Sequence, residues 1–147
     1  MLHPVPCLIP MTKPILLVED APNDIEFALF ALHKCGVTND IIVVNDGGEA
    51  LDYLLCRKQY RDRLPINPGL VLLDLKLPTV DGIEVLSTIR TTPALASIPV
   101  VVLTGSAMEA DISRTVALGI EEYVVKPMDI QQFVNIMCVL ASRFIKH

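Results

Sequence analysis

Polar residues that could do chemistry follow four of the five apolar runs in this sequence. Glu19 and Asp20 follow the first run, Asp74 the third, Thr104 the fourth and Lys126 the fifth. If these runs are parallel strands of one sheet, their ends share an edge, where ligands bind in open α/β sheets. Singly, each residue would be read as a turn or surface residue. Their coincidence at four strand ends predicts a single site.

Three carboxylates at one sheet edge would repel one another and raise their pKa values unless a cation joins them. Mg²⁺ is the best candidate, because it prefers oxygen ligands and completes its shell with water and phosphate oxygens. Asp74 could then attack phosphorus and form an aspartyl phosphate. The Lys126 ammonium and the Thr104 hydroxyl would stabilise the negative oxygens of the transferring group.

The elements that must position these residues alternate along the chain. Short apolar runs alternate with stretches of helical periodicity, a pattern typical of a parallel sheet with helices on both faces. The continuous apolar character of the runs indicates strands buried on both faces. We predict strands at 15–18, 41–44, 70–73, 100–103 and 123–125. We predict a first helix from Pro22 and Asn23 to Gly36, and further helices at 48–56, 82–91, 108–118 and 129–145. Five strand–helix units of this length favour a flavodoxin-like doubly wound sheet of order 2-1-3-4-5.

Bulk composition narrows the class of protein. The chain has 147 residues, of which 52% are hydrophobic and 20% charged, so it should fold as one domain. A net charge of -5 argues against a nucleic-acid surface, because phosphate backbones are bound by clustered Lys and Arg. No stretch approaches the roughly 20 uninterrupted apolar residues of a membrane helix. We therefore expect a cytoplasmic protein that binds neither nucleic acid nor membrane.

The cysteines and the N-terminus carry weaker signals. Cys7, Cys35, Cys56 and Cys138 show no paired spacing, so we expect four free thiols in a reducing cytoplasm. Residues 1–12 contain three prolines and lack the basic start of a signal peptide, so we interpret them as a loose leader before a domain at 13–147. Translation starting at Met11 is a further hypothesis, which the intact mass of the natively expressed protein tests.

The ordered set of strand-end motifs resembles the response-regulator receiver family, whose fold is called CheY-like. The matching stretches are Leu17-Val18-Glu19-Asp20, Leu72-Leu73-Asp74-Leu75-Lys76-Leu77-Pro78, Asp81-Gly82, Leu103-Thr104-Gly105 and Val125-Lys126-Pro127. The resemblance covers residues 13–145. The resemblance implies a bacterial two-component system in which a sensor histidine kinase phosphorylates the domain. The protein then catalyses only its own phosphorylation and dephosphorylation.

By that resemblance, the predicted site residues have particular roles. Asp74 is the phosphoacceptor, Thr104 the switch hydroxyl and Lys126 the phosphoryl-binding lysine. Asp20, Asp74 and the backbone carbonyl of Lys76 contact Mg²⁺, and Glu19 acts through water. The family has a cis bond before the proline of its last motif, here Lys126–Pro127.

Two positions near the site refine the resemblance. Tyr123 occupies the family's aromatic switch position, which implies that it turns inward when Thr104 moves towards the phosphate. A partly buried strand-end tyrosine explains it equally well. Lys76 departs from the shorter or neutral residue that relatives often carry. Its extra cation could hold the phosphoryl group or point to solvent, and we expect solvent.

Two surface features suggest partners. The last helix places Ile130, Phe133, Val134, Met137, Ala141 and Phe144 on one core-facing stripe and leaves Ile136 and Val139 outside it. We hypothesise a homodimer through Ile136 and Val139, although scattered exposed apolar residues are also ordinary. The basic segment 57–63 lengthens the connection before the third strand, either as a solvated helix extension or as a docking site for a kinase or other partner. This lengthening is similar to the small stand-alone regulators that pair with bacterial phytochromes.

Other functions fit the sequence less well. A flavodoxin-type FMN carrier needs a phosphate loop after the first strand, but residues 19–24 are acidic and would repel a phosphate. A haloacid-dehalogenase-like phosphatase needs a second catalytic aspartate two residues after the nucleophile, where this chain has Lys76. A receiver-like interaction module that works without phosphorylation remains the alternative, and the complete set of five site residues argues against it.

Overall fold

The computed structural model describes residues 12–126 and 129–145 of the chain. One parallel sheet has the strand order β2-β1-β3-β4-β5. Its strands are β1 (Ile15–Val18), β2 (Ile41–Val44), β3 (Leu70–Leu73), β4 (Val100–Thr104) and β5 (Glu122–Val125). The helices are α1 (Pro22–Lys34), α2 (Gly47–Leu54), α3 (Gly82–Thr91), α4 (Glu109–Leu118) and α5 (Ile130–Phe144). The predicted doubly wound fold is confirmed.

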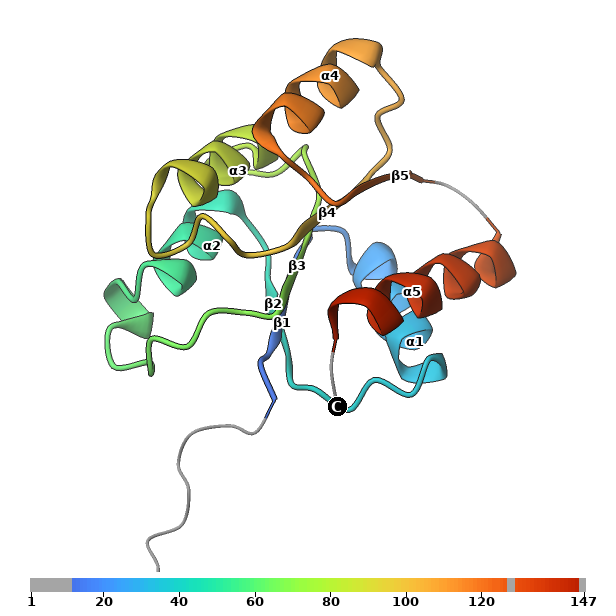
Figure 1. Cartoon of the computed structure of the whole chain (residues 1–147), viewed down its shortest axis with the longest axis horizontal. Helices are drawn as coiled ribbons and strands as arrows, with labels where there is room; N and C mark the ends of the chain where they lie inside the picture. Colours follow the sequence, from blue (N-terminus) through green and yellow to red (C-terminus); the bar gives the residue numbers. More distant parts are fainter. Residues whose placement is uncertain (1–11, 127–128, 146–147) are drawn as a thin grey trace, which may run out of the picture.

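The helices form two layers, one on each face of the sheet (Figure 1). Helices α1 and α5 cover one face, and α2, α3 and α4 lie on the other. Each layer closes its own apolar core, one centred on Leu17, Leu72 and Phe133 and the other on Leu16, Val71 and Leu86. Because the strands run parallel, the strand ends of the predicted site lie at the same edge of the sheet.

Burial of the strands follows their place in the sheet. Every residue of β1, β3 and β4 is buried, as the continuous apolar runs predict. The edge strands β2 and β5 are only partly buried, with Glu122 exposed, so the prediction of burial on both faces is wrong for them. An edge strand has a neighbour on one side only, and its outer rim faces solvent.

Local signals set most helix ends. Asp46, Asp81 and Asp129 each accept a backbone N–H three residues later and thereby cap α2, α3 and α5. Helix α2 ends at Leu54, two residues before the predicted end, and Cys56 has a positive φ of 53°. The basic segment that follows contains only a short 3-10 helix, Lys58–Tyr60, in place of the expected helix extension.

The buried face of α5 differs from the predicted stripe. Phe133, Met137 and Ala141 are buried as predicted, but Ile130 is 41% exposed and Leu140 is buried. The contact face is therefore rotated towards Leu140, because α5 packs against both the sheet and α1.

The expectation of four free thiols is wrong for two cysteines. Cys35, at the C-cap of α1, and Cys138, in α5, form a disulfide with their Cα atoms 5.1 Å apart. Two helices that share one sheet face bring these residues together across 103 positions of sequence. Cys56 is a free thiol, as expected, and Cys7 lies outside the described residues.

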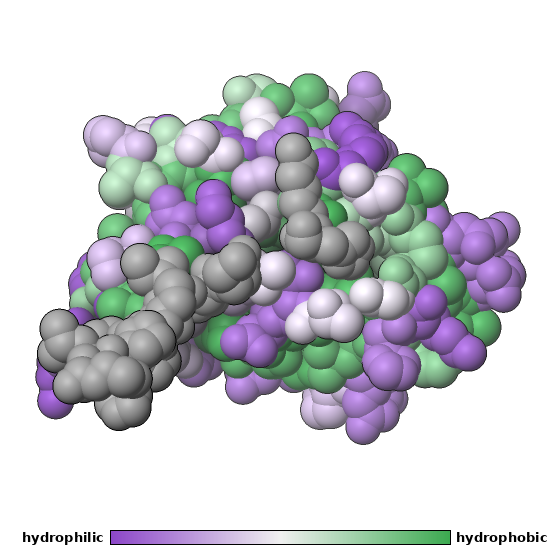
Figure 2. All heavy atoms as spheres, turned by 60° about the horizontal axis from the view of Figure 1, so that its bottom comes forward, coloured by the Kyte–Doolittle hydropathy of each residue, from purple (hydrophilic) through white to green (hydrophobic). Residues whose placement is uncertain are grey.

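The exposed surface is mixed in character. Figure 2 shows hydrophilic and hydrophobic side chains interspersed over one face of the molecule. The large exposed hydrophobic side chains come from several elements and include Phe30, Leu64, Val116 and Val139. In the part of the chain that the structure describes, no helix is long and apolar enough to cross a membrane.

Candidate functional site

The predicted acidic residues meet at the carboxyl ends of β1 and β3. These strands pair directly, with Val18 opposite Leu73, so the residues that follow them lie side by side. The backbone N–H of Asp74 donates to the Val18 carbonyl at 3.1 Å and holds the two strand ends together. One carboxylate oxygen each of Glu19, Asp20 and Asp74 lies within 4.8 Å of the other two. The first part of the predicted site is therefore assembled in space.

Glu19 is the most deeply buried of these acids, at 3% exposure. Its Oε2 accepts the backbone N–H groups of Asp20 at 3.0 Å and Ala21 at 3.2 Å. Burial raises the pKa of Glu19, and the hydrogen bond from Lys126 only partly offsets this effect, while the nearby charge of Asp74 adds to it. An added cation would therefore favour the ionised form of this carboxyl group.

Lys126 lies at the centre of the acidic cluster. Its Nζ is 2.6 Å from Glu19 Oε1, 2.9 Å from Asp24 Oδ2 and 3.5 Å from Asp74 Oδ2. Burial alone would lower the pKa of Lys126, but the hydrogen bonds to Glu19 and Asp24 and the charge of Asp74 outweigh it and raise the pKa. Lys126 is thus an ammonium ion at any pH at which the protein would work.

Asp24 is a site residue that the sequence analysis missed. It lies in the first turn of α1, where an acidic residue is usually read as a favourable partner of the helix dipole. The sequence signal for Asp24 was its position five residues after Glu19, because the first turn of a helix that starts there lies close to the end of the strand. Only the three-dimensional arrangement shows that it binds Lys126.

Thr104 and its neighbours border a hollow beside Asp74. Thr104 is fully buried, and its hydroxyl oxygen accepts the Ser106 N–H at 3.4 Å. The hollow, of about 490 Å³, is lined by Asp24, Asp74, Lys76, Thr104, Gly105, Ser106 and Lys126. A Cβ at Gly105 would meet no heavy atom closer than 4.0 Å, so this position is roomy. The space is open to a small group that approaches Asp74.

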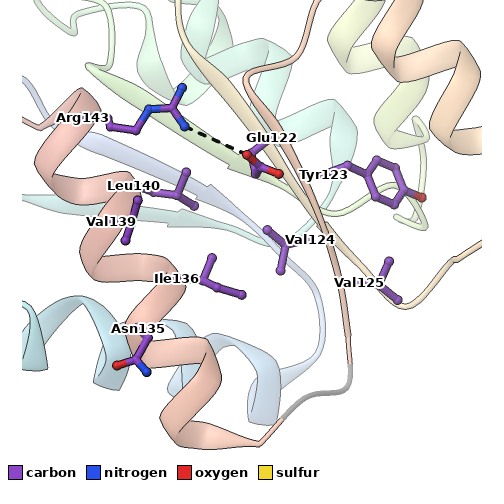
Figure 3. Close-up of a pocket in the computed structure, with 9 residues that line it drawn as sticks. All are labelled: Glu122, Tyr123, Val124, Val125, Asn135, Ile136, Val139, Leu140 and Arg143. Carbon is purple, nitrogen blue, oxygen red and sulfur yellow. Dashed lines mark ion pairs between the residues drawn. The ribbon is translucent and has the colours of Figure 1, made fainter.

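Lys76 and Tyr123 lie at the borders of this region. The Lys76 side chain is exposed, as expected, and Lys76 also lines the hollow. Its backbone N–H donates to Asp74 Oδ1 at 3.3 Å. Tyr123 points away from α5 (Figure 3), and its hydroxyl donates to the Ser106 carbonyl at 2.7 Å. Burial and the nearby carboxylates of Asp111 and Asp74 raise the pKa of Tyr123, although the hydrogen bond to Ser106 opposes this. Tyr123 is therefore tied to the loop that follows Thr104.

A glycine lets the next helix start close to Asp74. A Cβ on Gly82 would lie 2.2 Å from the Asp74 carbonyl oxygen and 2.6 Å from Leu75 Cα. The Gly82 N–H also donates to the Leu75 carbonyl at 2.7 Å. The strand end and the first turn of α3 can approach this closely only because the residue has no side chain.

The donor set suits a hard divalent cation. The clustered ligand atoms are carboxylate oxygens, which Mg²⁺ prefers, and the exposed Asp20 leaves one side accessible to water. Glu19, Asp20, Asp24 and Asp74 carry four potential negative charges against the single ammonium of Lys126. The predicted cis bond at Lys126–Pro127 involves Pro127, which lies outside the described residues.

Comparison with known proteins agrees with this geometry. The response regulator receiver domain family matches residues 15–137. Response regulator Rcp1 from Synechocystis is 37% identical over 119 residues, which are 81% of this chain and 80% of that protein. The structure of its Mn²⁺-bound form has a TM-score of 0.82 at 34% identity and covers 91% of this chain and 95% of that one.

Two further solved structures are similar. Bacteriophytochrome response regulator RtBRR has a TM-score of 0.78 at 49% identity, with 88% of this chain and 78% of that chain covered. The phosphorylated cyanobacterial phytochrome response regulator RcpA has a TM-score of 0.82 at 38% identity, with 90% and 93% covered. With its fold, its assembled acidic site and these relatives, the chain belongs to the response regulator receiver domain family, the signalling proteins of two-component systems.

Proposed function

We propose that this receiver domain is switched by phosphorylation of Asp74. The observation that carries the proposal is the position of the Asp74 carboxylate, which faces the hollow, adjoins the acids of β1 and lies 3.5 Å from the Lys126 ammonium. Asp74 is 9% exposed, so it is sheltered but can be reached through the hollow. A nucleophile, a cation to stabilise the incoming charge and space for the donor therefore occur together.

The proposed reaction moves one phosphoryl group. An Asp74 carboxylate oxygen forms a bond to phosphorus while the bond between phosphorus and the donor, a phosphohistidine nitrogen in a kinase, breaks. The Lys126 ammonium and the Thr104 hydroxyl stabilise the phosphoryl oxygens. Attack of water on phosphorus later releases inorganic phosphate and restores the Asp74 carboxylate.

Mg²⁺ is the proposed cofactor. Asp20, Asp74 and the Lys76 carbonyl would hold the ion, with Glu19 acting through water, and the mutual proximity of the carboxylates supports this assignment. When bound, the ion supplies positive charge to the phosphoryl oxygens. The relative Rcp1 holds Mn²⁺ in its solved structure, so a similar protein binds a divalent cation.

The proposed readout runs through the loop after β4. The Thr104 hydroxyl accepts the Ser106 N–H, and the Tyr123 hydroxyl donates to the carbonyl of the same serine. If Thr104 turns towards a phosphoryl group on Asp74, Ser106 loses one partner and the hydrogen bond to Tyr123 is disturbed. Phosphorylation would thus shift the population of Tyr123 positions on the face made by α4, β5 and α5.

A sensor histidine kinase of the phytochrome type is the proposed phosphodonor. Two of the similar structures are named as phytochrome or bacteriophytochrome response regulators, which supports this partner class. We also propose a cytoplasmic location, where such a kinase would meet its phosphate acceptor.

A homodimer through the groove between β5 and α5 is proposed as the assembled form. The groove, of about 500 Å³, is lined by apolar Val124, Ile136, Val139 and Leu140, and the ion pair between Glu122 and Arg143 borders it (Figure 3). Val139 is 59% exposed, whereas Ile136 is half-buried against the core. A second copy would present the same apolar strip with acidic and basic residues at its border, which suits a self-complementary two-fold interface.

Substitution of Val139 tests the dimer. We expect Val139→Glu to weaken self-association at least about tenfold in sedimentation equilibrium, because it places a charge in the apolar groove. Leu64→Glu, at a side chain 51% exposed in the segment before β3, is the matched control and should leave association unchanged. A wild-type protein that stays monomeric at high concentration, with and without phosphorylation, would rule the dimer out.

The intact mass after incubation with acetyl phosphate tests the switch itself. We expect wild type to gain one phosphoryl group only when Mg²⁺ is present, and Asp74→Asn to gain none. Folding of both proteins is checked by circular dichroism. If folded wild type stays unmodified with Mg²⁺ present, the alternative of an interaction module that works without phosphorylation is favoured.

A further inference from the structure

The disulfide between Cys35 and Cys138 has no role in the function described so far. It joins the C-cap of α1 to α5, and both cysteines are partly exposed, so small thiols can reach them. In a reducing cytoplasm, disulfides of mesophilic proteins are rare and are usually transient, catalytic or redox-sensing. A bond in this place therefore calls for an explanation other than permanent reinforcement of the fold.

We propose that Cys35 and Cys138 form a reversible redox site whose oxidation state sets how freely α5 moves against α1 when Asp74 is phosphorylated. The coupling to phosphorylation rests on the proposed function. The redox site itself rests only on the described pair of cysteines and can be tested without phosphate.

Helix α1 is tied to the C-terminal part of the chain at both of its ends. At its N-terminal turn, Asp24 binds Lys126 at 2.9 Å, and at its C-cap, Cys35 is bonded to Cys138. Between these ties the contact is apolar, with the rings of Phe27 and Phe133 4.8 Å apart. A phosphoryl group on Asp74 would compete with Asp24 for the Lys126 ammonium. The disulfide would then be the covalent tie that holds α1 to α5, beside their apolar packing.

Helix α5 connects this tie to the proposed interface. Cys138 lies on the side of α5 that faces α1. The next residue, Val139, lines the apolar groove on the side of α5 that faces β5. Any rotation or shift of α5 relative to α1 therefore moves the groove. The oxidised form holds the groove in one position, whereas the reduced form permits it to move.

The redox step is a thiol–disulfide exchange with a small disulfide such as oxidised glutathione. One cysteine thiolate attacks a glutathione sulfur and releases one glutathione thiolate, and the second cysteine thiolate then displaces the other. The two protons lost by the cysteines are taken up by the two released glutathione thiolates, and reduction is the reverse. After reduction the Cys35 thiol still has an acceptor, because its Sγ lies 3.5 Å from the Val134 carbonyl oxygen.

Titration of the full chain with glutathione tests the redox site. In a Cys7→Ser/Cys56→Ser background, only the pair can react, and alkylation with N-ethylmaleimide followed by intact mass counts free thiols. We expect two free thiols at high ratios of reduced to oxidised glutathione, none at low ratios, and a melting temperature about 10–15 °C higher in the oxidised form. Cys138→Ser in the same background should lack this thermal difference. Two thiols that stay alkylatable at every ratio, or equal melting temperatures in both forms, would overturn the proposal.

Hydrogen exchange after phosphorylation tests the coupling. With acetyl phosphate and Mg²⁺, we expect amides of the C-terminal half of α5 to exchange at least about tenfold faster in the reduced than in the oxidised form. Equal exchange in two forms that both carry the phosphoryl group would refute the coupling. Failure of both forms to take up phosphate would instead refute the proposed phosphorylation and the coupling with it, and the glutathione titration would still decide the redox site.

Discussion

Replacement of Lys126 by methionine should destabilise the domain, even though methionine keeps most of the apolar length of the side chain. In wild type the ammonium lies 2.6 Å from Glu19 Oε1, and the Glu19 side chain is 4% exposed. Removing one partner of a buried ion pair typically costs about 3–5 kcal/mol. Because Lys126 also contacts Asp24, whose side chain is 44% exposed, we expect the lower end, about 3 kcal/mol at pH 7.

The stability lost in Lys126→Met should increase as the pH rises. The pKa of Glu19 in the folded protein is raised above the model-peptide value of 4.5, and loss of the Lys126 hydrogen bond raises it further. The folded state then binds this proton more tightly than the unfolded state, so stability falls as pH rises above about 4.5 through the raised pKa. We expect the variant to be close to wild type below pH 4.5 and to show the full loss near pH 7.

Urea unfolding in metal-free buffer from pH 4 to pH 8 measures this loss. Lys76→Met is the matched control, because Lys76 lines the same hollow but is exposed, and it should follow wild type at every pH. Added Mg²⁺ should recover more stability in the Lys126 variant than in wild type, since it restores positive charge beside the carboxylates. Parallel stability curves for wild type and the Lys126 variant across this pH range would refute the reasoning.

Two further predictions concern packing and a partly buried hydroxyl. Gly82→Ala should lower the free energy of unfolding by about 2–3 kcal/mol, because the added Cβ would lie 2.2 Å from the Asp74 carbonyl oxygen. Gly105→Ala is the control: its Cβ would have 4.0 Å of space, so it should lower the free energy of unfolding far less in the same urea titration. Tyr60 donates to Glu49 at 2.8 Å, and burial and this partner raise its pKa from 10.0 to about 12. The neutral hydroxyl therefore stabilises the fold below pH 10, and this contribution is lost between pH 10 and about 12. Tyrosine ionisation is followed by absorbance at 295 nm, and Tyr60→Phe should remove the titration near pH 12 from this signal. A variant that keeps this titration would contradict the assignment.

The fold and most of the site could be predicted because both follow from local sequence. An apolar run marks a buried strand, and the first polar residue after it marks the strand end, so Glu19 and Asp74 could be placed at the same edge. The register of β1 and β3, which sets Val18 opposite Leu73, brings their carboxylates together. Helix α3 was predicted at its observed bounds from its helical periodicity, and in the structure Asp81 caps it.

The features that could not be predicted depend on contacts between distant segments. Cys35 and Cys138 show no local spacing of a disulfide, and only the packing of α1 beside α5 brings them together. Asp24 has the sequence signature of an ordinary first-turn residue, and its role depends on the reach of Lys126 from the end of β5. Leu140 joins the core because α5 packs against both the sheet and α1, which a projection of one helix cannot represent.

The charges at the site explain why phosphorylation should affect α1 as well as the loop after β4. Among the described residues, the ammonium of Lys126 is the cation within ion-pair distance of Glu19, Asp24 and Asp74. A phosphoryl group on Asp74 would carry about 1.5–2 negative charges in place of the single charge of the carboxylate, so the site would gain about 0.5–1 negative charge. If the Lys126 ammonium turns to the phosphoryl oxygens, Asp24 is the partner released at the lowest cost, because its side chain is 44% exposed and can be solvated by water. The first turn of α1 would then lose its tie to Lys126 in the same event that is proposed to move Thr104 and Tyr123 towards the site.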